Sequence, residues 1–336
     1  MVTEVHESHP HLYHYTNFDG LKGILETQTL WATHYTGLND SSEILLLRPR
    51  LEDLIFEKIR EIIREDMKRG YSRRKFWEKH GGITRVSREE AKKLTNVFYE
   101  ATFLGTSDTV PIATPYILSF CAHTGHNDYT KNNGLLSQWR AYGENGGYAL
   151  VFDTKRLWEC LNVEWKYYNY VGGNFGDVVY DDETGKFEIE FTNLFSSLGI
   201  WVRSFASKDK EPPSEDVLAP LLSAASRFKH RGFKEESEVR VSVYPTSEAF
   251  ARTVKEEVPL KLKPIQYRKK GDDQVQYIAL NEVPKKKPLP IIRIIIGPQR
   301  DQKQRAKDVK KIIGKKNIDI VCSETPYLPP QARISN

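Results

Sequence analysis

An acidic run at residues 233–241 (FKEESEVRV) holds the side chains best suited to chemistry. From residue 238 to 244, valines alternate with polar residues, a pattern typical of a β-strand with one face in the core. Successive strand side chains point to opposite faces, so Glu236, Glu238 and Arg240 share the face opposite the valines. The functional interpretation is a catalytic carboxylate oriented by its neighbours, which Arg240 would keep ionised. The alternative is a solvent-facing Glu–Arg pair of little energetic worth.

A histidine lies within the aromatic stretch LYHYT at residues 12–16, which alternates as a short strand does. His14, with Tyr15 and Thr16 beside it, is a candidate binding residue, and the alternative is a core histidine with satisfied hydrogen bonds. His6, His9, His11 and His14 are closely spaced. No carboxylate or cysteine pattern completes a ligand set with them, so no metal site is expected.

Two further stretches could line a pocket. In LSQWRAYG (136–143), Trp139 and Tyr142 are three residues apart and share a helix face. Such a ring can stack on a flat ligand, and the alternative is core packing. In LNDSSE (38–43), Asn39 is a candidate binding residue, whereas turn formation and helix capping explain the same residue types.

The elements that must position these residues follow from hydrophobic period and capping. We expect one α+β domain over residues 11–330, because strands and helices do not alternate regularly. Residues 43–103 form a helical insertion, in which Pro49 should interrupt or open the helix. Residues 124–133 form a polar, mobile loop. Strands are predicted over residues 12–16, 30–35, 115–121, 148–153, 238–244, 258–262, 274–280, 291–297 and 318–323. Helices are predicted over residues 18–27 (capped by Asn17), 43–69, 88–103, 135–142, 154–161, 190–206, 214–228 and 299–311.

Composition bounds the class of protein. The 336 residues are 39% hydrophobic and 11% aromatic, enough for a packed core. No run approaches the roughly 18 apolar residues of a membrane span, and the N-terminus does not read as a secretory signal. Three scattered cysteines predict neither a disulfide framework nor a cysteine-rich zinc site, so we expect a cytoplasmic protein without membrane partners.

The charge is unevenly spread. The net charge is +5, yet residues 260–316 hold 17 Lys or Arg against 5 Asp or Glu. Such a segment attracts polyanions, so nucleic acid is a candidate partner. The alternative is a solvated basic surface on a helix and two loops.

These stretches, in order, resemble the ADP-ribosyltransferase superfamily. More closely, they resemble a bacterial family within it, domain of unknown function twenty-nine seventy-one. The similar motifs are "YHYT" (13–16), "LND..E" (38–43), "WRAYG" (139–143), "E.EVR" (236–240) and "IIGP" (295–298). The resemblance spans residues 11–298 and implies a split, twisted antiparallel β-core that holds NAD+ in a cleft.

The resemblance also implies roles. His14 would hold the adenosine ribose, Tyr142 would stack on nicotinamide, and Glu238 would bond the nicotinamide ribose. Glu236 is similar to the first acid of the paired-glutamate motif of arginine-modifying relatives. The absence of a clear first-strand arginine puts arginine in doubt as the target.

The expected activity is cleavage of the nicotinamide–ribose bond of NAD+ and transfer of ADP-ribose to a macromolecule, protein or nucleic acid. A toxin or anti-phage role would fit by family analogy. The alternatives are hydrolysis of NAD+ with water as acceptor, and a non-catalytic nucleic-acid-binding module on the same fold.

Overall fold

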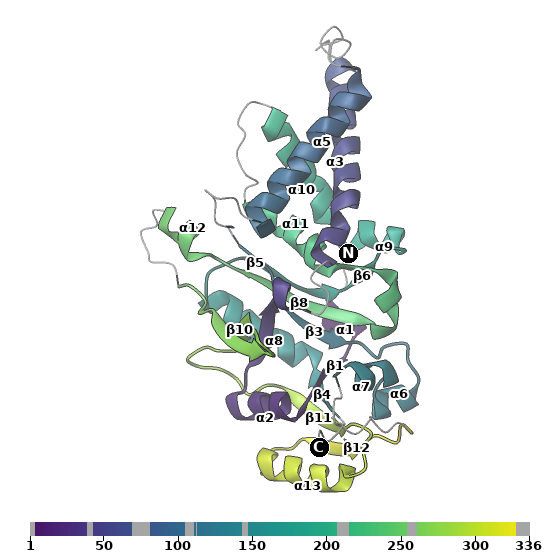
Figure 1. The fold of residues 1–336 in the computed structure, drawn as a ribbon, viewed down its shortest axis with the longest axis vertical. Coiled ribbons are helices and arrows are strands. Elements are labelled where there is room, and N and C mark those ends of the chain that lie inside the picture. The colour runs from purple at the N-terminus through teal and green to yellow at the C-terminus, as the bar shows by residue number, and fades with distance from the viewer. Residues whose placement is uncertain are drawn as a thin grey trace.

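The computed structural model describes residues 4–38, 43–68, 81–104, 111, 113–142, 147–206, 215–253 and 261–326. A ten-stranded sheet forms the centre, and helices cover both of its faces (Figure 1). All strand pairs of this sheet are antiparallel except β11–β12. The predicted α+β class is therefore confirmed.

The strands are β1 (His11–Thr16), β2 (Leu30–His34), β3 (Tyr116–Cys121), β4 (Tyr148–Asp153), β5 (Tyr170–Asp177), β6 (Val179–Tyr180), β7 (Phe228–Lys229), β8 (Glu238–Pro245), β9 (Gln266–Lys270), β10 (Asp273–Leu280), β11 (Ile291–Ile296) and β12 (Asp319–Cys322). The helices are α1 (Val5–Ser8), α2 (Phe18–Thr27), α3 (Glu43–Lys68), α5 (Ile83–Tyr99), α6 (Asp128–Asn133), α7 (Leu136–Tyr142), α8 (Thr154–Tyr167), α9 (Thr184–Glu190), α10 (Thr192–Ala206), α11 (Glu215–Arg227), α12 (Glu248–Thr253) and α13 (Gln302–Ile313). Short non-α turns are η1 (Tyr35–Gly37), η2 (Glu100–Leu104) and η4 (Arg231–Glu236).

The sheet branches at β3. Along one edge β3 pairs with β8 from Tyr116 to Cys121. On its other edge, β2 pairs at the N-terminal end, through Ile117, and β1 pairs at the C-terminal end, through Cys121. The strands β1 and β2 therefore diverge from a common neighbour.

The two faces of the sheet carry different cores. One face buries alternate residues such as Leu12, Phe120 and Val241, and α2, α8 and α13 pack on it. On the opposite face, Tyr13, Tyr15, Cys121 and Trp139 form a small cluster under α7. Beside it on that face, α3, α5, α10 and α11 form a larger core against β5 and β8.

Several predicted elements are confirmed. Helix α2 and strand β4 have the predicted bounds, and the side chain of Asn17 accepts a hydrogen bond from the backbone N–H of Gly20, as an N-cap should. The strands β1, β2, β3, β8, β10, β11 and β12 lie within a few residues of their predictions. The predicted helix over 190–206 is divided at Phe191, where α9 ends.

Four predictions were wrong or incomplete. Helix α3 continues through Pro49, which lies inside it. The segment 124–133 is not wholly a loop, because Asn127 caps α6 by accepting from the N–H of Thr130. Strand β8 is buried on both faces rather than one. Strand β5, the neighbour of β8, had no counterpart in the prediction. The strand expected over 258–262 falls mostly outside the described residues, and residues 261 and 262 are not in a strand.

Candidate functional site

Two acids and two bases form a buried cluster at the start of β8. Arg240 grips the Glu238 carboxylate with two donors, Nε to Oε1 at 2.7 Å and Nη2 to Oε2 at 3.1 Å. The ammonium of Lys229 lies 2.8 Å from Glu238 Oε2 and 2.8 Å from Glu236 Oε2. Glu238, Arg240 and Lys229 are at most 5% exposed, whereas the Glu236 side chain is 24% exposed. Among the described residues, two carboxylates thus face two cations.

The chain conformation around Ser237 brings these groups together. Ser237 has a left-handed backbone (φ 43°) between η4 and β8, and its carbonyl accepts from the N–H of Ala122. The Glu238 N–H donates to the hydroxyl of Tyr180. Lys229 arrives on the two-residue strand β7, which directly follows α11. The cluster thus lies where β8, β7 and β6 meet the end of β3.

The cluster keeps Glu238 ionised. Burial alone would raise the pKa of this carboxyl, but the charges of Arg240 and Lys229 and their hydrogen bonds outweigh burial and lower the pKa to about 2. Burial and the charges of Glu238 and Glu236 raise the pKa of the neighbouring Cys121 thiol. Cys121 is therefore held as a thiol and does not qualify as a nucleophile.

Tyr142 brings an exposed ring to the same place. It is 41% exposed at the end of α7. Burial of its hydroxyl raises its pKa to about 12, and the nearby charges of Glu236 and Glu238 act in the same direction. Helix α7 contacts η4, which ends at Glu236, so the partly exposed Tyr142 side chain lies in the neighbourhood of the buried Glu238 carboxylate. The role expected for Tyr142 stays a prediction.

Tyr15 and Trp139 form an aromatic wall beside the cluster, on the same sheet face. Their rings meet edge to face at 4.8 Å, and Trp139 is 2% exposed. The Tyr15 hydroxyl accepts from the N–H of Leu135 and contacts His123 Nε2 at 3.2 Å. Core packing, the alternative considered for Trp139 and Tyr142, therefore applies to Trp139, whereas Tyr142 is 41% exposed.

His14 and Thr16 alternate with Tyr15 and lie on the other face of β1. The His14 ring packs edge to face on Phe120, in the core opposite Glu238. Its Nδ1 contacts the carbonyl of Ser119 at 3.0 Å, where β1 leaves β3. The structure therefore does not bring His14 and Thr16 together with Glu238. Asn39 lies outside the described residues.

Lys229 and Tyr180 complete the cluster but carry no signal in the sequence. Both lie in two-residue strands, which are too short for an alternating pattern. Only the pairing of β6 with β7 places them beside β8.

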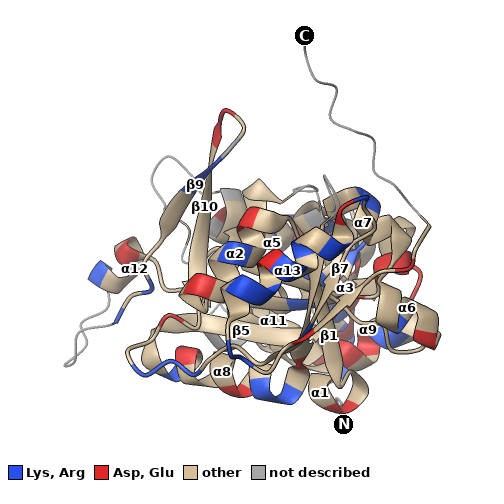
Figure 2. Cartoon of the chain, turned by 90° about the horizontal axis from the view of Figure 1, so that it is seen from below, with Lys and Arg blue, Asp and Glu red and all other residues tan. Residues whose placement is uncertain are grey.

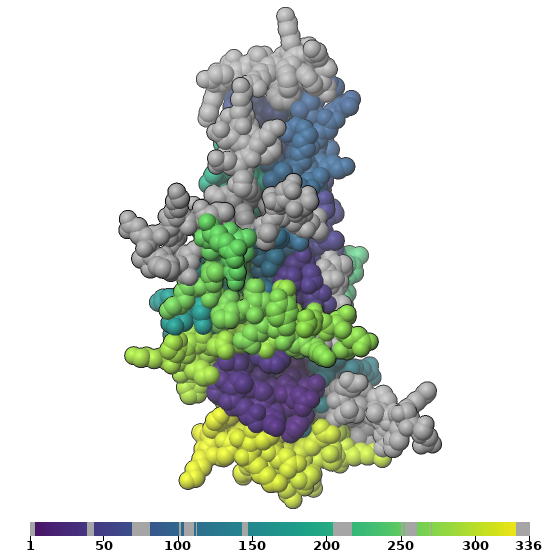
Figure 3. All heavy atoms as spheres, turned by 60° about the vertical axis from the view of Figure 1, so that its left-hand side comes forward, coloured from purple at the N-terminus to yellow at the C-terminus, as the bar shows by residue number. Residues whose placement is uncertain are grey.

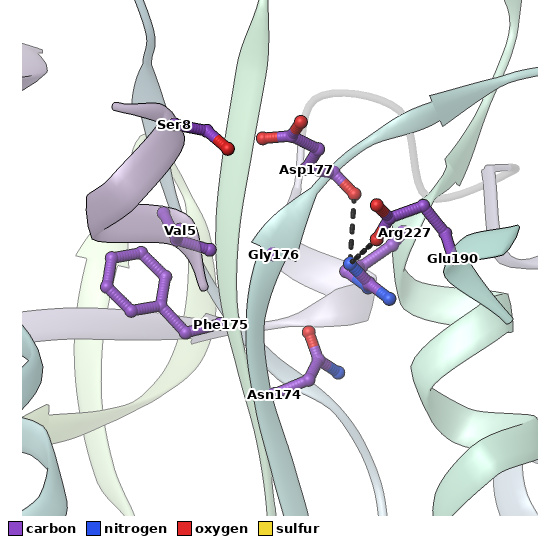
Figure 4. A pocket seen from close by; sticks show the side chains of 8 residues that line it. All are labelled: Val5, Ser8, Asn174, Phe175, Gly176, Asp177, Glu190 and Arg227. Atoms are coloured by element: carbon purple, nitrogen blue, oxygen red, sulfur yellow. Dashed lines mark hydrogen bonds and ion pairs between the residues drawn. The ribbon is translucent and has the colours of Figure 1, made fainter. Parts of the chain in front are cut away.

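A cavity of about 170 Å³ lies at the edge of β5, close to the cluster (Figure 4). The guanidinium of Arg227 forms one wall, and its Nη1 donates to the carbonyl of Asp177 and to Glu190. Ser8 and Asp177 face each other across its rim (Figure 4). The volume is below the roughly 300–1,000 Å³ of small-molecule pockets, so this cavity is too small for a dinucleotide.

The N-terminal histidines have separate partners. His6 contacts Glu4, His9 contacts both Asp177 and Thr124, and His14 contacts a backbone carbonyl. Within the described residues there is no group of three or more His, Cys, Asp or Glu arranged to hold a metal ion. None of the described helices is long and apolar enough to cross a membrane.

The fold and cluster define an α+β protein with a buried site of paired acids and bases on a branched sheet. Residues 138–241 match a family model described as "Protein of unknown function (DUF2971)". The matched segment runs from α7 into β8 and contains Trp139, Tyr142 and all four charged residues of the cluster. This match supports the family resemblance over that segment. Neither the curated proteins nor the solved structures gave a match.

Proposed function

We propose that this protein is an NAD+-dependent ADP-ribosyltransferase that cleaves the nicotinamide–ribose bond at Glu238. The observation that carries the proposal is the ionised, 5% exposed carboxylate of Glu238, with the 41% exposed side chain of Tyr142 within reach of its charge. The match over residues 138–241 includes both residues, although it assigns them no role.

The chemistry needs little more than these groups. Breaking the C–N bond leaves an oxocarbenium-like ribose, and nicotinamide departs with the electron pair as a neutral molecule. A fixed carboxylate shielded from water stabilises the positive charge that develops on the sugar. The acceptor oxygen or nitrogen then bonds the ribose carbon and loses its proton. Tyr142 would stack on the nicotinamide ring.

A ribose hydroxyl must find room at a carboxylate that already has partners. Lys229 offers a route, because its ammonium is equally close to Glu236 and Glu238. If Lys229 shifts to Glu236, Oε2 of Glu238 regains one acceptor position for a ribose hydroxyl, while Arg240 still binds both oxygens and keeps the carboxylate ionised. Glu236 would then act as the positioning partner of Lys229, and Glu238 as the catalytic residue.

The acceptor we propose is a macromolecule, and nucleic acid is favoured by the basic segment 260–316. The basic side chains of this segment lie mainly on β9, on the turn at 285–287 and on α13. These elements surround α2, which lies between α13 and the strands β9 and β10 (Figure 3). Some neutralise the end of α2, since Lys286 and Lys316 donate to the carbonyls of Thr27 and Leu25. Acids are mixed with the basic residues over α2 and α13 (Figure 2). Transfer to protein, and NAD+ hydrolysis, are the competing outcomes.

One observation favours a non-catalytic module. Glu238 is almost fully buried with both oxygens bonded, as in a structural ion-pair network. In that case the protein would bind nucleic acid through the basic segment, without NAD+, and its affinity would fall steeply with salt.

The test is incubation with NAD+ labelled on the adenylate, with and without cell lysate, following free nicotinamide and labelled macromolecules. Tyr142→Ala is the most informative variant, because an exposed side chain can be truncated with little effect on folding. We expect turnover to fall at least 10-fold in Tyr142→Ala and to persist in Tyr142→Phe. Tyr129→Ala, at a tyrosine 47% exposed on α6, is the matched control and should be unchanged.

Glu238→Gln tests the catalytic carboxylate and should abolish nicotinamide release, whereas Glu236→Gln should only reduce it. The melting temperature of each variant separates loss of activity from loss of fold. Label on nucleic acid or protein identifies the acceptor class, and release without macromolecular label indicates hydrolysis. Full turnover in folded Glu238→Gln, or no turnover by the wild type in any lysate, would refute the proposal.

A further inference from the structure

A second, larger cavity lies where β11 and β12 end side by side and the chain turns into α13. Its volume is about 450 Å³, within the range of small-molecule sites. The walls include Pro298 and Gln299 before α13, Gln302 at its first turn, and Glu324 and Pro326 after β12. Nothing in the proposed reaction uses this site, and it lies outside the matched segment 138–241.

Gln299 has an unpaired amide in this cavity wall. The residue is 9% exposed, and in the part of the chain that the structure describes its side-chain oxygen and nitrogen are both buried and have no hydrogen-bond partner. Each unpaired buried polar group costs about 1–3 kcal/mol. A rotation of this side chain toward the cavity would present an unpaired donor and acceptor to a ligand with the complementary pair.

The neighbouring glutamine shows the contrast. Gln302 donates through Nε2 to the carbonyls of Ile296, Gly297 and Ser323, so it ties the ends of β11 and β12 together. Ser323 is equally engaged, because its hydroxyl donates to the carbonyl of Asn133. Gln302 and Ser323 thus fix the positions of the surrounding segments, whereas the amide of Gln299 still has a donor and an acceptor to offer.

We propose that this cavity binds a planar group that presents a hydrogen-bond donor and acceptor side by side, such as the edge of a nucleobase or a primary carboxamide. A glutamine amide pairs with such an edge through two parallel hydrogen bonds, as it does with adenine. Pro298 and Pro326 offer flat apolar walls. The carboxylate of Glu324 adds an acceptor for an amino group and disfavours a phosphate.

Calorimetric titration of the whole protein tests this, with adenosine, nicotinamide and inorganic phosphate as separate probes. We expect adenosine or nicotinamide to bind with a dissociation constant below about 1 mM. Whichever of the two binds identifies the source of the planar edge, and inosine, which lacks the 6-amino donor, should bind at least 10-fold more weakly than adenosine if the base is recognised.

Gln299→Leu should weaken binding at least 10-fold and leave the melting temperature equal or higher, because leucine removes two unpaired polar atoms. Gln304→Leu, an exposed glutamine on α13, is the matched control and should bind as the wild type. No binding of either probe at 10 mM, wild-type binding by Gln299→Leu, a lowered melting temperature of that variant, or preferential binding of phosphate would each overturn the proposal. Retention of binding in Glu238→Gln separates this site from the proposed reaction.

Discussion

At the scale of single residues, Glu238 combines two properties that usually exclude each other. The side chain is buried and charged, and its ionised form is stabilised by two cations at hydrogen-bonding distance. Removing one partner of such a cluster leaves an uncompensated buried charge and typically costs 3–5 kcal/mol. The same arrangement serves a structural role and the proposed catalytic one, so stability and activity must be measured on the same variants.

The lowered pKa of Glu238 predicts how stability depends on pH. Its folded-state pKa, about 2, is below the ordinary value of 4.5, so its contribution is fully present above pH 4.5 and disappears as the pH falls toward 2. The contribution is at most about 3 kcal/mol. Urea unfolding of wild type and Glu238→Gln between pH 7 and pH 2.5 should show a less stable variant at neutral pH with a shallower acid decline. Parallel declines would show that the carboxylate is not held ionised by its neighbours.

At the scale of elements, α3 tolerates a residue that normally breaks a helix. Pro49 has no N–H for the carbonyl of Leu45, but Leu45 is 45% exposed, so water can replace that bond. Ile44, Leu47 and Leu51 are at most 2% exposed and hold the helix on either side of the proline. The packing of this face overrides the local preference that led to the wrong prediction.

Replacing this proline should therefore stabilise the protein. Pro49→Ala restores the backbone bond to Leu45 and should raise the free energy of unfolding by about 1–3 kcal/mol, less than the full helix penalty because proline also stiffens the unfolded chain. Glu57→Ala, at an exposed position of the same helix, should change it by less than about 0.5 kcal/mol. Equal values for the two variants in urea unfolding would contradict this account of α3.

How far the sequence predicts the structure depends on whether local pattern or remote packing sets each element. Strand β4 and helix α2 follow from period and capping alone. Strand β5 could not be found, because three glycines hide its alternation. Two of these glycines leave room for residues of α11, which are distant in the sequence. A Cβ at Gly172 would lie 3.0 Å from the Ala219 side chain, and one at Gly176 would overlap the Arg227 guanidinium.

In the candidate site, too, the sequence predicted what local pattern sets and not what remote packing sets. Period two correctly placed Glu238 and Arg240 on one face of β8. Glu236 is not in that strand: it ends η4 and joins the cluster through the left-handed turn at Ser237 and through Lys229. The burial of Glu238 and Arg240 was not predicted, because helices from residues 43–104 and 184–227 cover that face only in the folded chain. The same period separates His14 from Tyr15, so one motif could not deliver both to one site.

At the scale of the whole molecule, a second buried ion pair joins distant parts of the chain. The Lys263 ammonium lies 2.6 Å from Glu164 Oε1 on α8, and both side chains are fully buried. The contact is an ion pair rather than an aligned hydrogen bond. Glu164 also accepts from the Tyr170 hydroxyl and from the N–H of Glu282, so three segments meet at one carboxylate.

Lys263→Met should destabilise the protein by about 3–5 kcal/mol, because Glu164 stays buried without a counter-charge. The double change Lys263→Met with Glu164→Gln should recover part of that loss, since the amide oxygen still accepts from Tyr170 and Glu282. Urea unfolding of the wild type, both single variants and the double variant measures the coupling. A cost below about 1 kcal/mol for Lys263→Met alone would show that the pair contributes little.

The branched sheet also constrains when this protein can fold during its synthesis. Thr33 of β2 pairs with Tyr277 of β10, about 240 residues later, and Tyr13 of β1 pairs with Val151 of β4. At 5–20 residues per second, a ribosome needs about 12–50 s to supply the missing partner of β2. Strand β2, the second strand made, is therefore among the last to be completed, and the nascent chain depends on protection of its open edge until the C-terminal third emerges.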